Sequence, residues 1–382
     1  MLYLWKENNL KVLLIFTFEY SLKTWKESGS LERELSYYNK LAEKFNIKFL
    51  FLTYGNENEK NYLVDYPNID VIPMYKYIKA VNNKYLLFFK TLIVPFLIRK
   101  KISDINIIKT NQLNGSWVGI VLRLITRKPL FIRTGYDAFL FSIKEKKPLM
   151  KRALFYLLTQ LSLIFSKLYT VSSFDDYEFI SKYYLFNKSK LQIRQNWINE
   201  NNKIKFENRN NYKIISIGRL ASQKNYDYLI SEFSNSEYSI DLVGTGPDEE
   251  FLSEKSKKFN TNVNFLGNIE YEKLMEMLND YKYFVSTSLF EGNPKVILEA
   301  MAAGCVVFAV DIPNNSEIIK HKHNGLLYKP GERNLLSIFQ RISDNKNLSK
   351  SISQNAINDS KSIYSRSKLI EMEYDDYLNL SK

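Results

Sequence analysis

The sequence contains very little cysteine and histidine, and it lacks a common metal-binding pattern. The single cysteine, Cys305, cannot form an internal disulfide, which excludes a disulfide scaffold and argues against a cysteine zinc site. The two histidines, His321 and His323, are too few for a histidine metal site, and we interpret them as part of a solvated loop. No two aspartates stand two residues apart, so a DxD motif is absent. These absences favour a reducing compartment and leave no motif for a metal.

Long apolar runs are also missing. Because no stretch reaches about 18 uninterrupted apolar residues, we predict no transmembrane helix. The nearest case, Leu86–Ile98, is interrupted by Lys90 and Pro95. The first ten residues lead straight into an apolar strand pattern and do not resemble a signal peptide. We therefore expect a cytoplasmic protein.

Acidic residues are scarce in one part of the chain. The whole chain of 382 residues holds 54 Lys and Arg against 41 Asp and Glu, a net charge of +13. Residues 1–200 have a net charge of 31 − 17 = +14, and residues 201–382 have 23 − 24 = −1. The excess is concentrated in residues 71–170, where the count is 18 − 3 = +15. A basic stretch of this kind indicates an anionic partner, such as phosphates, nucleic acid or a membrane surface.

Short apolar runs alternate with helical patterns from end to end. The predicted strands are Lys11–Phe18, Ile47–Thr53, Ile105–Lys109, Leu130–Arg133, Leu168–Ser172, Tyr212–Ile217, Ser239–Val243, Asn262–Leu266, Tyr283–Thr287 and Val306–Val310. The predicted helices are Leu31–Phe45, Gly115–Ile125, Leu149–Phe165, Tyr226–Phe233, Asp248–Phe259, Tyr271–Asp280, Pro294–Ala303 and Ser365–Leu380. Such alternation predicts βαβ units and a mainly parallel sheet.

The polar segment Asn199–Asn211 interrupts this alternation, and we interpret it as a linker. The fold class is therefore α/β, with two tandem doubly wound, Rossmann-like domains over residues 1–200 and 201–364. A helix over 365–382 follows, and we expect it to pack back on the first domain. Ligands of such sheets bind at the carboxyl ends of the strands, so the cleft between the domains is the natural site.

Glycine makes up 13 of the 382 residues, about half of its average share of roughly 7%. Gly218, Gly244, Gly246 and Gly267 nevertheless lie at or just past the ends of predicted strands. Glycine at such a position allows the backbone to approach a ligand closely. The segment Gly244–Asp248 lacks both GxGxxG and the Walker pattern, so we interpret it as a tight strand-to-helix turn that leaves a ligand contact open.

Two cations follow the first of these glycines. Arg219 comes directly after Gly218, and Lys224 follows five residues later. Arg grips a phosphate with two N–H groups and Lys supplies a compact charge, so the two together suit a diphosphate. The alternative is a pair of solvated surface cations on a loop.

A second constellation spans Phe290 to Gly304. Asn293 is a good N-cap, Pro294 suits the first helical position, and Gly304 ends the helix. The helix N-terminus can bind an anion through free N–H groups. Glu291 precedes this helix and Glu299 lies inside it, where carboxylates can accept hydrogen bonds from sugar hydroxyls. The alternative is two solvated carboxylates.

Taken together and in this order, these motifs resemble the retaining GT-B glycosyltransferases of the large bacterial family 4. The resemblance covers residues 212–330 and includes the E-x7-E element at Glu291 and Glu299. The other matching pieces are Gly218-Arg219-Leu220 with Lys224-Asn225, Gly244-Thr245-Gly246-Pro247, Phe265-Leu266-Gly267, Glu317-Ile318-Ile319 and Asn324-Gly325-Leu326-Leu327.

The resemblance implies roles for these residues. Arg219 and Lys224 would hold the donor diphosphate, with Gly218 and Gly244 in the binding loops, and Glu299 would bind the nucleotide ribose. Glu291, together with the backbone of Gly292 and Asn293, would meet the donor sugar or its phosphates. We thus assign catalysis to Glu291, Arg219 and Lys224. The resemblance also implies retention of configuration, with the leaving phosphate deprotonating the acceptor, and no metal or other cofactor.

One departure from the family concerns the first domain. Many relatives carry a histidine there at the end of a strand, whereas this chain has no histidine before His321. The comparable segment runs from Phe131 to Asp137, and Arg133, Tyr136 or Asp137 would take the place of the histidine.

The leading hypothesis is a glycosyltransferase of cell-envelope polysaccharide biosynthesis. It would use a UDP-, GDP- or ADP-sugar and a glycan or lipid-linked acceptor, and would bind the anionic inner face of the cytoplasmic membrane through residues 71–170. The alternative is a non-catalytic basic module that binds nucleic acid or anionic lipid. The apolar content of Tyr85–Lys101 suits a membrane interface better than stacked bases, so we expect no nucleic-acid partner. That segment is also compatible with a core-packed helix.

Overall fold

The computed structural model describes residues 10–198, 205–292, 294–331 and 335–382. The chain forms two compact units. Unit 1 comprises the chain up to Ser172, Asp176–Arg194 and Leu369–Lys382, and unit 2 comprises Ser173–Asp175 and Gln195–Lys368. Apart from the short segment Ser173–Asp175, the chain belongs to unit 2 from Gln195 to Lys368 and returns to unit 1 at Leu369.

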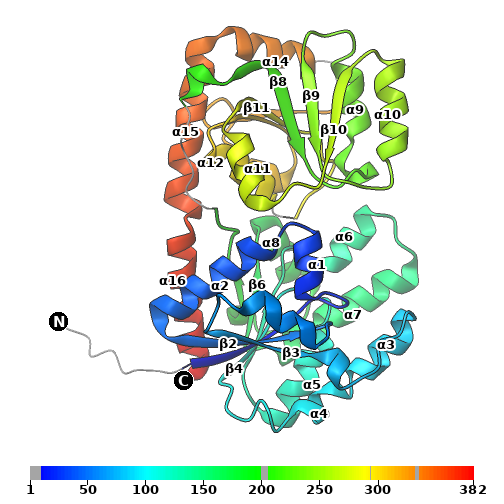
Figure 1. Cartoon of the computed structure of the whole chain (residues 1–382), viewed down its shortest axis with the longest axis vertical. Coiled ribbons are helices and arrows are strands. Elements are labelled where there is room, and N and C mark those ends of the chain that lie inside the picture. The colour runs from blue at the N-terminus through cyan, green and yellow to red at the C-terminus, as the bar shows by residue number, and fades with distance from the viewer. Residues whose placement is uncertain (1–9, 199–204, 293, 332–334) are drawn as a thin grey trace, which may run out of the picture. The chain divides into compact units, whose positions relative to one another are not determined.

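Unit 1 is built on a parallel sheet with the strand order β3-β2-β1-β4-β5-β6-β7 (Figure 1). The strands are β1 (Leu10–Ile15), β2 (Ile47–Thr53), β3 (Ile69–Pro73), β4 (Ile107–Thr110), β5 (Leu130–Arg133), β6 (Leu168–Val171) and β7 (Leu191–Ile193). The helices are α1 (Leu22–Glu27), α2 (Leu31–Phe45), α3 (Lys84–Thr91), α4 (Val94–Ile98), α5 (Ser116–Thr126), α6 (Ala138–Lys144), α7 (Leu149–Phe165) and α8 (Phe174–Tyr183), with 3-10 turns η1 (Glu57–Leu63), η2 (Met74–Lys76) and η3 (Lys188–Lys190). The first two residues of α8 are counted with unit 2.

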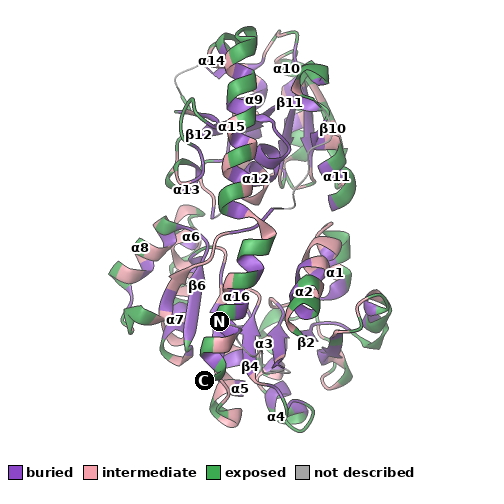
Figure 2. Cartoon of the chain, turned by 90° about the vertical axis from the view of Figure 1, so that its left-hand side faces the viewer, coloured by how far each residue is buried: buried purple, intermediate pink, exposed green. Residues whose placement is uncertain are grey.

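Alternate residues of the strands in unit 1 face opposite helix layers, as the two-residue period of a strand requires. On β2, Phe49 and Phe51 contact Tyr38 of α2, with ring centroids 5.1 and 5.4 Å apart. Their neighbours Leu50 and Leu52 belong to the opposite core, which α3, α4, α5 and α7 cover. The sheet is therefore buried on both faces, and Figure 2 shows its strands as buried while the helices alternate between buried and exposed residues.

A buried ion pair joins the last helix, α16 (Arg366–Ser381), to the sheet of unit 1. Lys109 of β4 is fully buried and pairs with Glu373 of α16. The Tyr37 hydroxyl donates to Glu373 at 2.8 Å, and an Arg133 guanidinium nitrogen lies 3.9 Å from the same carboxylate. Burial alone would raise the pKa of Glu373, but the charges of Lys109 and Arg133 hold it below its ordinary value.

Unit 2 is built on a parallel sheet with the strand order β10-β9-β8-β11-β12-β13. The strands are β8 (Asn210–Ile217), β9 (Ser239–Val243), β10 (Asn262–Gly267), β11 (Tyr281–Ser286), β12 (Val306–Val310) and β13 (Leu326–Tyr328). The helices are α9 (Tyr226–Glu232), α10 (Glu249–Lys258), α11 (Tyr271–Leu278), α12 (Lys295–Ala302), α13 (Pro313–Ser316), α14 (Leu335–Asp344) and α15 (Lys346–Tyr364), with 3-10 turns η4 (Phe206–Asn208) and η5 (Ser222–Lys224). On β12, Val306 and Phe308 pack in the core under α9 and α14, while Val307 and Ala309 pack against α11, α12 and α15.

The predicted fold class is confirmed, since both units are parallel α/β sheets covered by helices. In each sheet the strand order reverses between two central strands, β1 and β4 in unit 1 and β8 and β11 in unit 2. Open α/β sheets bind ligands beyond the carboxyl ends of the strands at such a reversal. In unit 2 this point lies just after Ile217 and Ser286, which end β8 and β11.

Candidate functional site at the strand ends of unit 2

The turn after β8 brings Lys224 against Gly218. The Gly218 N–H donates to the Val243 carbonyl of β9 at 2.9 Å, which fixes the start of the turn. A Cβ on Gly218 would lie 2.7 Å from Lys224 Cε and 3.0 Å from the Tyr226 hydroxyl, closer than such atoms approach. A residue without a side chain is therefore needed here so that Lys224 can lie across the end of the strand.

The structure brings Lys224 and Glu291 together. Lys224 Nζ lies 2.5 Å from Glu291 Oε1, and the two side chains are only 15% and 11% exposed. The Lys224 carbonyl accepts a hydrogen bond of 2.6 Å from Thr287 Oγ1, just past the end of β11. Two of the three predicted catalytic residues thus form one ion pair, and the ammonium group keeps further N–H donors for a ligand.

The loop after β11 is tied to η5 by further hydrogen bonds. Gln223 Nε2 donates to the Phe290 carbonyl at 2.8 Å, and the Leu289 N–H donates to the Gln223 carbonyl at 3.0 Å. These bonds fix the loop that carries Glu291 relative to the turn that carries Lys224. Such fixed positioning is what charge stabilisation at a reacting centre requires.

Arg219 is exposed on the same turn. Within residues 10–198, 205–292, 294–331 and 335–382 it has no hydrogen-bond or ion-pair partner. The alternative interpretation was that both residues are solvated cations on a loop. It fits Arg219, which is exposed in this structure, but it is wrong for Lys224, which is largely buried and paired. Arg219 therefore offers its guanidinium group to an anion beside the end of β8.

Gly244 and Gly246 let two backbone segments touch. A Cβ on Gly244 would lie 2.2 Å from the Gly218 carbonyl oxygen, and one on Gly246 would lie 2.1 Å from the Leu220 carbonyl oxygen. The Leu220 N–H also donates to the Thr245 carbonyl at 3.0 Å. This close packing of backbone explains why glycine stands at both positions, as the predicted tight turn requires. The contact between Gly244 and a ligand stays a prediction.

Glu299 is a buried carboxylate on α12. Its exposed fraction is 4%, so the sequence alternative of a solvated Glu299 is wrong. Helix α12 begins at Lys295, and Pro294 is the residue before it rather than the first helical residue. Gly292 is buried beside Glu291, whereas Asn293, the predicted N-cap, lies outside the described residues.

The three candidates for the missing histidine of unit 1 differ in their surroundings. Arg133 points to Glu373 beneath α16 and is largely buried, so it belongs to the buried ion pair. Asp137 is buried as the N-cap of α6, where it accepts from the Leu140 N–H at 2.7 Å, and burial raises its pKa to about 6. Tyr136 is 38% exposed. Of the three, Tyr136 presents the most accessible side chain.

Sequence reasoning missed a cavity of about 660 Å³ in unit 1, beside the ends of β1 and β2. Tyr54, Tyr62 and Lys26 contribute to its lining. The buried Glu59 carboxylate accepts from the Leu22 N–H at 2.6 Å and holds the start of α1 against this cavity. The one sequence signal for it is that Tyr54 directly follows the predicted strand Ile47–Thr53.

Over the part of the chain that the structure describes, no group of three or more His, Cys, Asp or Glu side chains is placed to hold a metal ion. The cationic groups at the strand ends of unit 2 are instead Arg219 and Lys224. The site thus combines two cations, a carboxylate paired with one of them, and a buried carboxylate on the following helix. Such a set can bind a diphosphate and accept hydrogen bonds from hydroxyl groups.

Comparison with known families and proteins identifies relatives of this chain. Residues 198–359 match the family Glycosyl transferases group 1. An uncharacterized glycosyltransferase of Haemophilus influenzae is 31% identical over 132 residues, which are 31% of this chain and 35% of that protein. The GtfA subunit of a UDP-N-acetylglucosamine–peptide N-acetylglucosaminyltransferase from Streptococcus agalactiae is 28% identical over 36% of this chain and 26% of that protein. This chain thus aligns with about a third or less of those two relatives.

A longer alignment and solved structures extend the likeness to both units. An uncharacterized glycosyltransferase of Methanocaldococcus jannaschii is 25% identical over 77% of this chain and 78% of that protein. The crystal structure of Anabaena HepE in complex with UDP and glucose has a TM-score of 0.75 at 17% identity and covers 97% of this chain and 100% of that chain. Sucrose-phosphate synthase from Thermosynechococcus elongatus has a TM-score of 0.78 at 15% identity and covers 97% of this chain and 99% of that chain. Residues 198–359 are therefore similar to the family Glycosyl transferases group 1, and the whole chain has the fold of GT-B glycosyltransferases.

Proposed function

We propose that this chain transfers a sugar from a nucleotide-sugar donor to a glycan or lipid-linked acceptor, with retention of configuration and without a metal ion. The observation that carries the proposal is the Lys224–Glu291 pair at the ends of β8 and β11, on the same turn as the exposed Arg219 and within the part of the chain that the family model matches. The alternative of a basic binding module leaves this arrangement without a purpose.

The donor diphosphate lies against Arg219 and Lys224 in this proposal. Negative charge develops on the departing phosphate as the bond to the sugar breaks, and two preorganised cations stabilise it. Glu299 accepts hydrogen bonds from ribose hydroxyls, and Glu291 with the backbone of Gly292 and Asn293 meets the donor sugar or its phosphates. A UDP-sugar is the proposed donor, because related folds have been crystallised with UDP, with UDP and glucose, and with UDP-glucose.

Retention follows from attack on the face that the leaving group vacates. The acceptor oxygen forms the new bond to the sugar carbon while the bond to the diphosphate breaks, and the acceptor proton passes to the leaving phosphate. This step needs no base from the protein. Asp137 of unit 1 agrees with this, because its carboxylate accepts hydrogen bonds from Leu140 and Tyr184 rather than facing a substrate. The protein supplies position and positive charge.

The cavity of unit 1 is the proposed acceptor site. Tyr62 offers an aromatic ring to a sugar, and Lys26 offers a cation to the phosphate of a lipid-linked glycan. Replacing Tyr62 by Ala is expected to raise the KM for the acceptor without changing donor hydrolysis, as measured by initial rates with and without acceptor.

The proposed location is the inner face of the cytoplasmic membrane, where a cell-envelope glycan on a lipid carrier would be presented. Large apolar side chains project from α3, α4 and α7, and α5 contacts both α4 and α7. The most exposed of them are Tyr85, Phe89, Phe96, Leu149, Met150, Leu154 and Leu157, which are 52% to 80% exposed. An apolar face rimmed by cations suits an anionic bilayer. No described helix is both long and apolar enough to cross a membrane.

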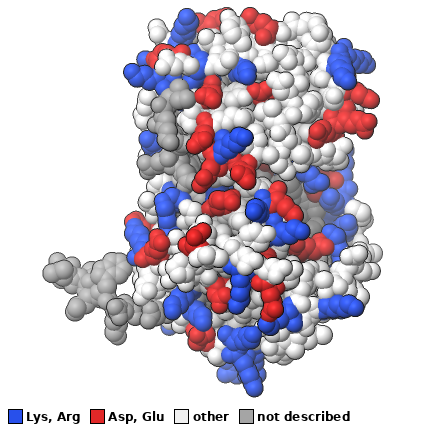
Figure 3. Space-filling model, viewed as in Figure 1, with Lys and Arg blue, Asp and Glu red and all other residues white. Residues whose placement is uncertain are grey.

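Charge on this surface supports the same partner. Of the three acids in residues 71–170, Asp104 pairs with Lys11 at 2.8 Å, Asp137 is buried, and Glu145 lies 3.4 Å from Lys147. Figure 3 shows Lys and Arg gathered over the tip of unit 1 where α4 lies. Flotation with vesicles tests this: wild type should float only with anionic vesicles, and Phe89→Ser/Phe96→Ser should float less. Protein that stays in solution with every vesicle would contradict membrane docking.

The activity is tested by release of product nucleotide from a panel of UDP-, GDP- and ADP-sugars. Because each supplies one charged group of the site, Arg219→Ala and Glu299→Ala should each lower turnover by about two orders of magnitude. Glu250→Ala is the matched control, because Glu250 is exposed in the first turn of α10. Turnover that survives in both site variants would refute the proposal.

A further inference from the structure

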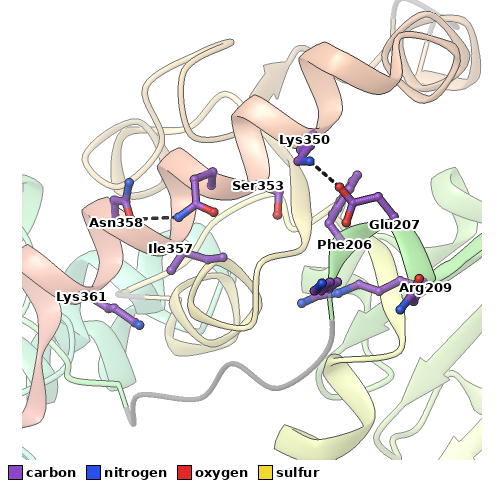
Figure 4. A pocket seen from close by; sticks show the side chains of 11 residues that line it. Phe206, Glu207, Arg209, Lys350, Ser353, Ile357, Asn358 and Lys361 are labelled. Carbon is purple, nitrogen blue, oxygen red and sulfur yellow. Dashed lines mark hydrogen bonds and ion pairs between the residues drawn. The ribbon is translucent and has the colours of Figure 1, made fainter.

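A groove in unit 2 lies between the segment Lys205–Arg209 and one face of α15. Its volume is about 740 Å³, within the range of small-molecule sites. Figure 4 shows Ser353, Ile357 and Lys361 along the α15 wall, and Glu207 and Arg209 on the other side. The α15 residues recur at helical spacing, so they form one continuous wall.

The groove is rich in positive charge. Its lining includes Lys205, Arg209, Lys350 and Lys361 against one carboxylate, Glu207. Glu207 is already paired with Lys350 at 2.5 Å. Residues 201–382 as a whole have a net charge of 23 − 24 = −1, so this concentration of cations is a local feature. A concave surface that carries charge of one sign concentrates ligands of the opposite charge.

One of these cations is fixed and the others are adaptable. The Arg209 side chain is 5% exposed, and its guanidinium group donates to the Tyr281 carbonyl at 3.4 Å. Lys350, by contrast, has a side chain that is 64% exposed. Phosphate oxygens accept several N–H bonds each, so a fixed guanidinium with ammonium groups on both walls suits a ligand with more than one phosphate.

The groove is separate from the strand-end site. Arg209 directly precedes β8, whereas Gly218 directly follows it. At about 3.3 Å per residue, a strand of 8 residues spans about 26 Å. An anion in the groove therefore lies near the opposite end of β8 from Arg219 and Lys224, too far for one small ligand to occupy both sites.

Residues that line the groove also contact the chain just after α12. Ser353 Oγ donates to the Gly304 carbonyl at 2.6 Å, just past the last turn of α12. Atoms of Ile357, Arg209 and Ser353 lie 3.0 to 3.3 Å from the place that a Cβ on Gly304 would take. Glu299 lies five residues earlier on the chain, about one and a half helical turns away. A ligand in the groove would therefore contact residues that pack directly on the helix of Glu299.

We propose that this groove is a second anion site, which binds a small molecule bearing two or more phosphate groups and alters nucleotide binding through α12. The binding part is independent of the proposed function, and the regulatory part rests on it.

Titration calorimetry with inorganic tripolyphosphate at constant ionic strength tests the site. The starting protein is Arg219→Ala/Lys224→Ala, in which the strand-end site is weakened, and it should still bind tripolyphosphate. Adding Lys350→Ala/Lys361→Ala should weaken this binding by about tenfold or more, because two charged donors are lost. Adding Lys257→Ala/Lys258→Ala, an equal charge change on α10, should leave it unchanged. Thermal melting checks that each variant is folded.

Loss of all binding in Arg219→Ala/Lys224→Ala would overturn the second site. The second site would also be overturned if Lys257→Ala/Lys258→Ala weakened tripolyphosphate binding as much as Lys350→Ala/Lys361→Ala does. The same holds if sulfate at matched ionic strength bound as well as tripolyphosphate. For the regulatory part, the UDP affinities of wild type and Lys350→Ala/Lys361→Ala are compared in the presence of tripolyphosphate. A difference of about threefold or more is expected, and equal affinities would overturn the coupling. These binding measurements need no turnover, so they stand even if the proposed activity fails.

Discussion

Each unit contains a Lys–Glu pair that is largely shielded from water, and the two pairs have different surroundings. Lys109 and Glu373 of unit 1 have side chains that are 0% and 6% exposed, and they are 264 residues apart in sequence. Lys224 and Glu291 of unit 2 have side chains that are 15% and 11% exposed, and they are 67 residues apart. The first pair joins a strand to the last helix, while the second joins two loops at strand ends.

The difference teaches how surroundings decide what an ion pair does. The Lys109 ammonium group lies 5.1 Å from the ring centre of Tyr38 and 5.7 Å from that of Tyr377, so aromatic rings fill the space that a ligand would need. The Lys224 pair instead lies beside a glycine turn and the exposed Arg219. We infer that the first pair stabilises the position of α16 and that the second is available to a ligand.

The largest expected effect is on the buried pair. Lys109→Met leaves the Glu373 carboxylate buried without its main partner, which should lower the free energy of unfolding by about 3–5 kcal/mol. Urea unfolding followed by circular dichroism measures it. The double variant Lys109→Met/Glu373→Gln should recover part of the loss, because a neutral amide needs no counter-charge, while Arg133 loses the carboxylate beside it. Equal stability of wild type and Lys109→Met would contradict the structural role.

The matched change in unit 2 should affect activity more than stability. Lys224→Met leaves the Glu291 carboxylate without its partner, so the free energy of unfolding should fall, but by less than for Lys109→Met, because this pair keeps more contact with water. Nucleotide release should fall by about two orders of magnitude, because a charge-stabilising donor is lost. If Lys224→Met instead unfolds easily and keeps its specific activity, the contrast between the two pairs is wrong.

Much of the fold was predictable because most inner strands are short runs dominated by apolar residues. The predicted bounds of Ile47–Thr53, Leu130–Arg133, Ser239–Val243 and Val306–Val310 agree with β2, β5, β9 and β12. The strands that were missed, β3, β7 and β13, lie at sheet edges. Two of them have only 3 residues, too few for a period of two to be recognised.

The site was predictable in part. Gly218, Lys224 and Glu291 were found because strand-end glycines and a family motif marked them, and the structure brings these residues together. Glu373 was not predicted to matter, because its partner Lys109 is distant in sequence and neither residue belongs to a motif. The prediction that Asn293 is the N-cap is wrong, because α12 begins at Lys295 and Pro294 occupies the N-cap position.

A smaller effect is expected from a buried acid that lies beside another carboxylate rather than a cation. The Asp137 N–H donates to Asp176, and burial raises the pKa of Asp137 from 3.8 to about 6. The folded state therefore holds this proton more tightly than the unfolded state, so stability is lost as pH rises from about 4 to 6. Asp137→Asn should remove about 2 kcal/mol of this loss, because the amide does not titrate, while its oxygen still accepts from Leu140 and its NH2 group can donate to the Tyr184 hydroxyl. Urea unfolding at pH 4.5 and pH 7 measures it, and an unchanged pH dependence would argue against a buried acid.

The smallest effect concerns the hydroxyl that orients the pair of unit 2. Thr287→Val keeps the shape of the side chain and removes the hydrogen bond to the Lys224 carbonyl, so the free energy of unfolding should fall by about 1 kcal/mol. This hydrogen bond holds the backbone of Lys224 and does not contact its ammonium group. The KM for the donor should therefore rise, while turnover at saturating donor changes little. Initial rates over a range of donor concentrations separate the two. Thr287→Ser, which keeps the donor, should restore the wild-type KM. A loss of turnover as large as that of Lys224→Met would instead assign Thr287 a direct contact with the substrate.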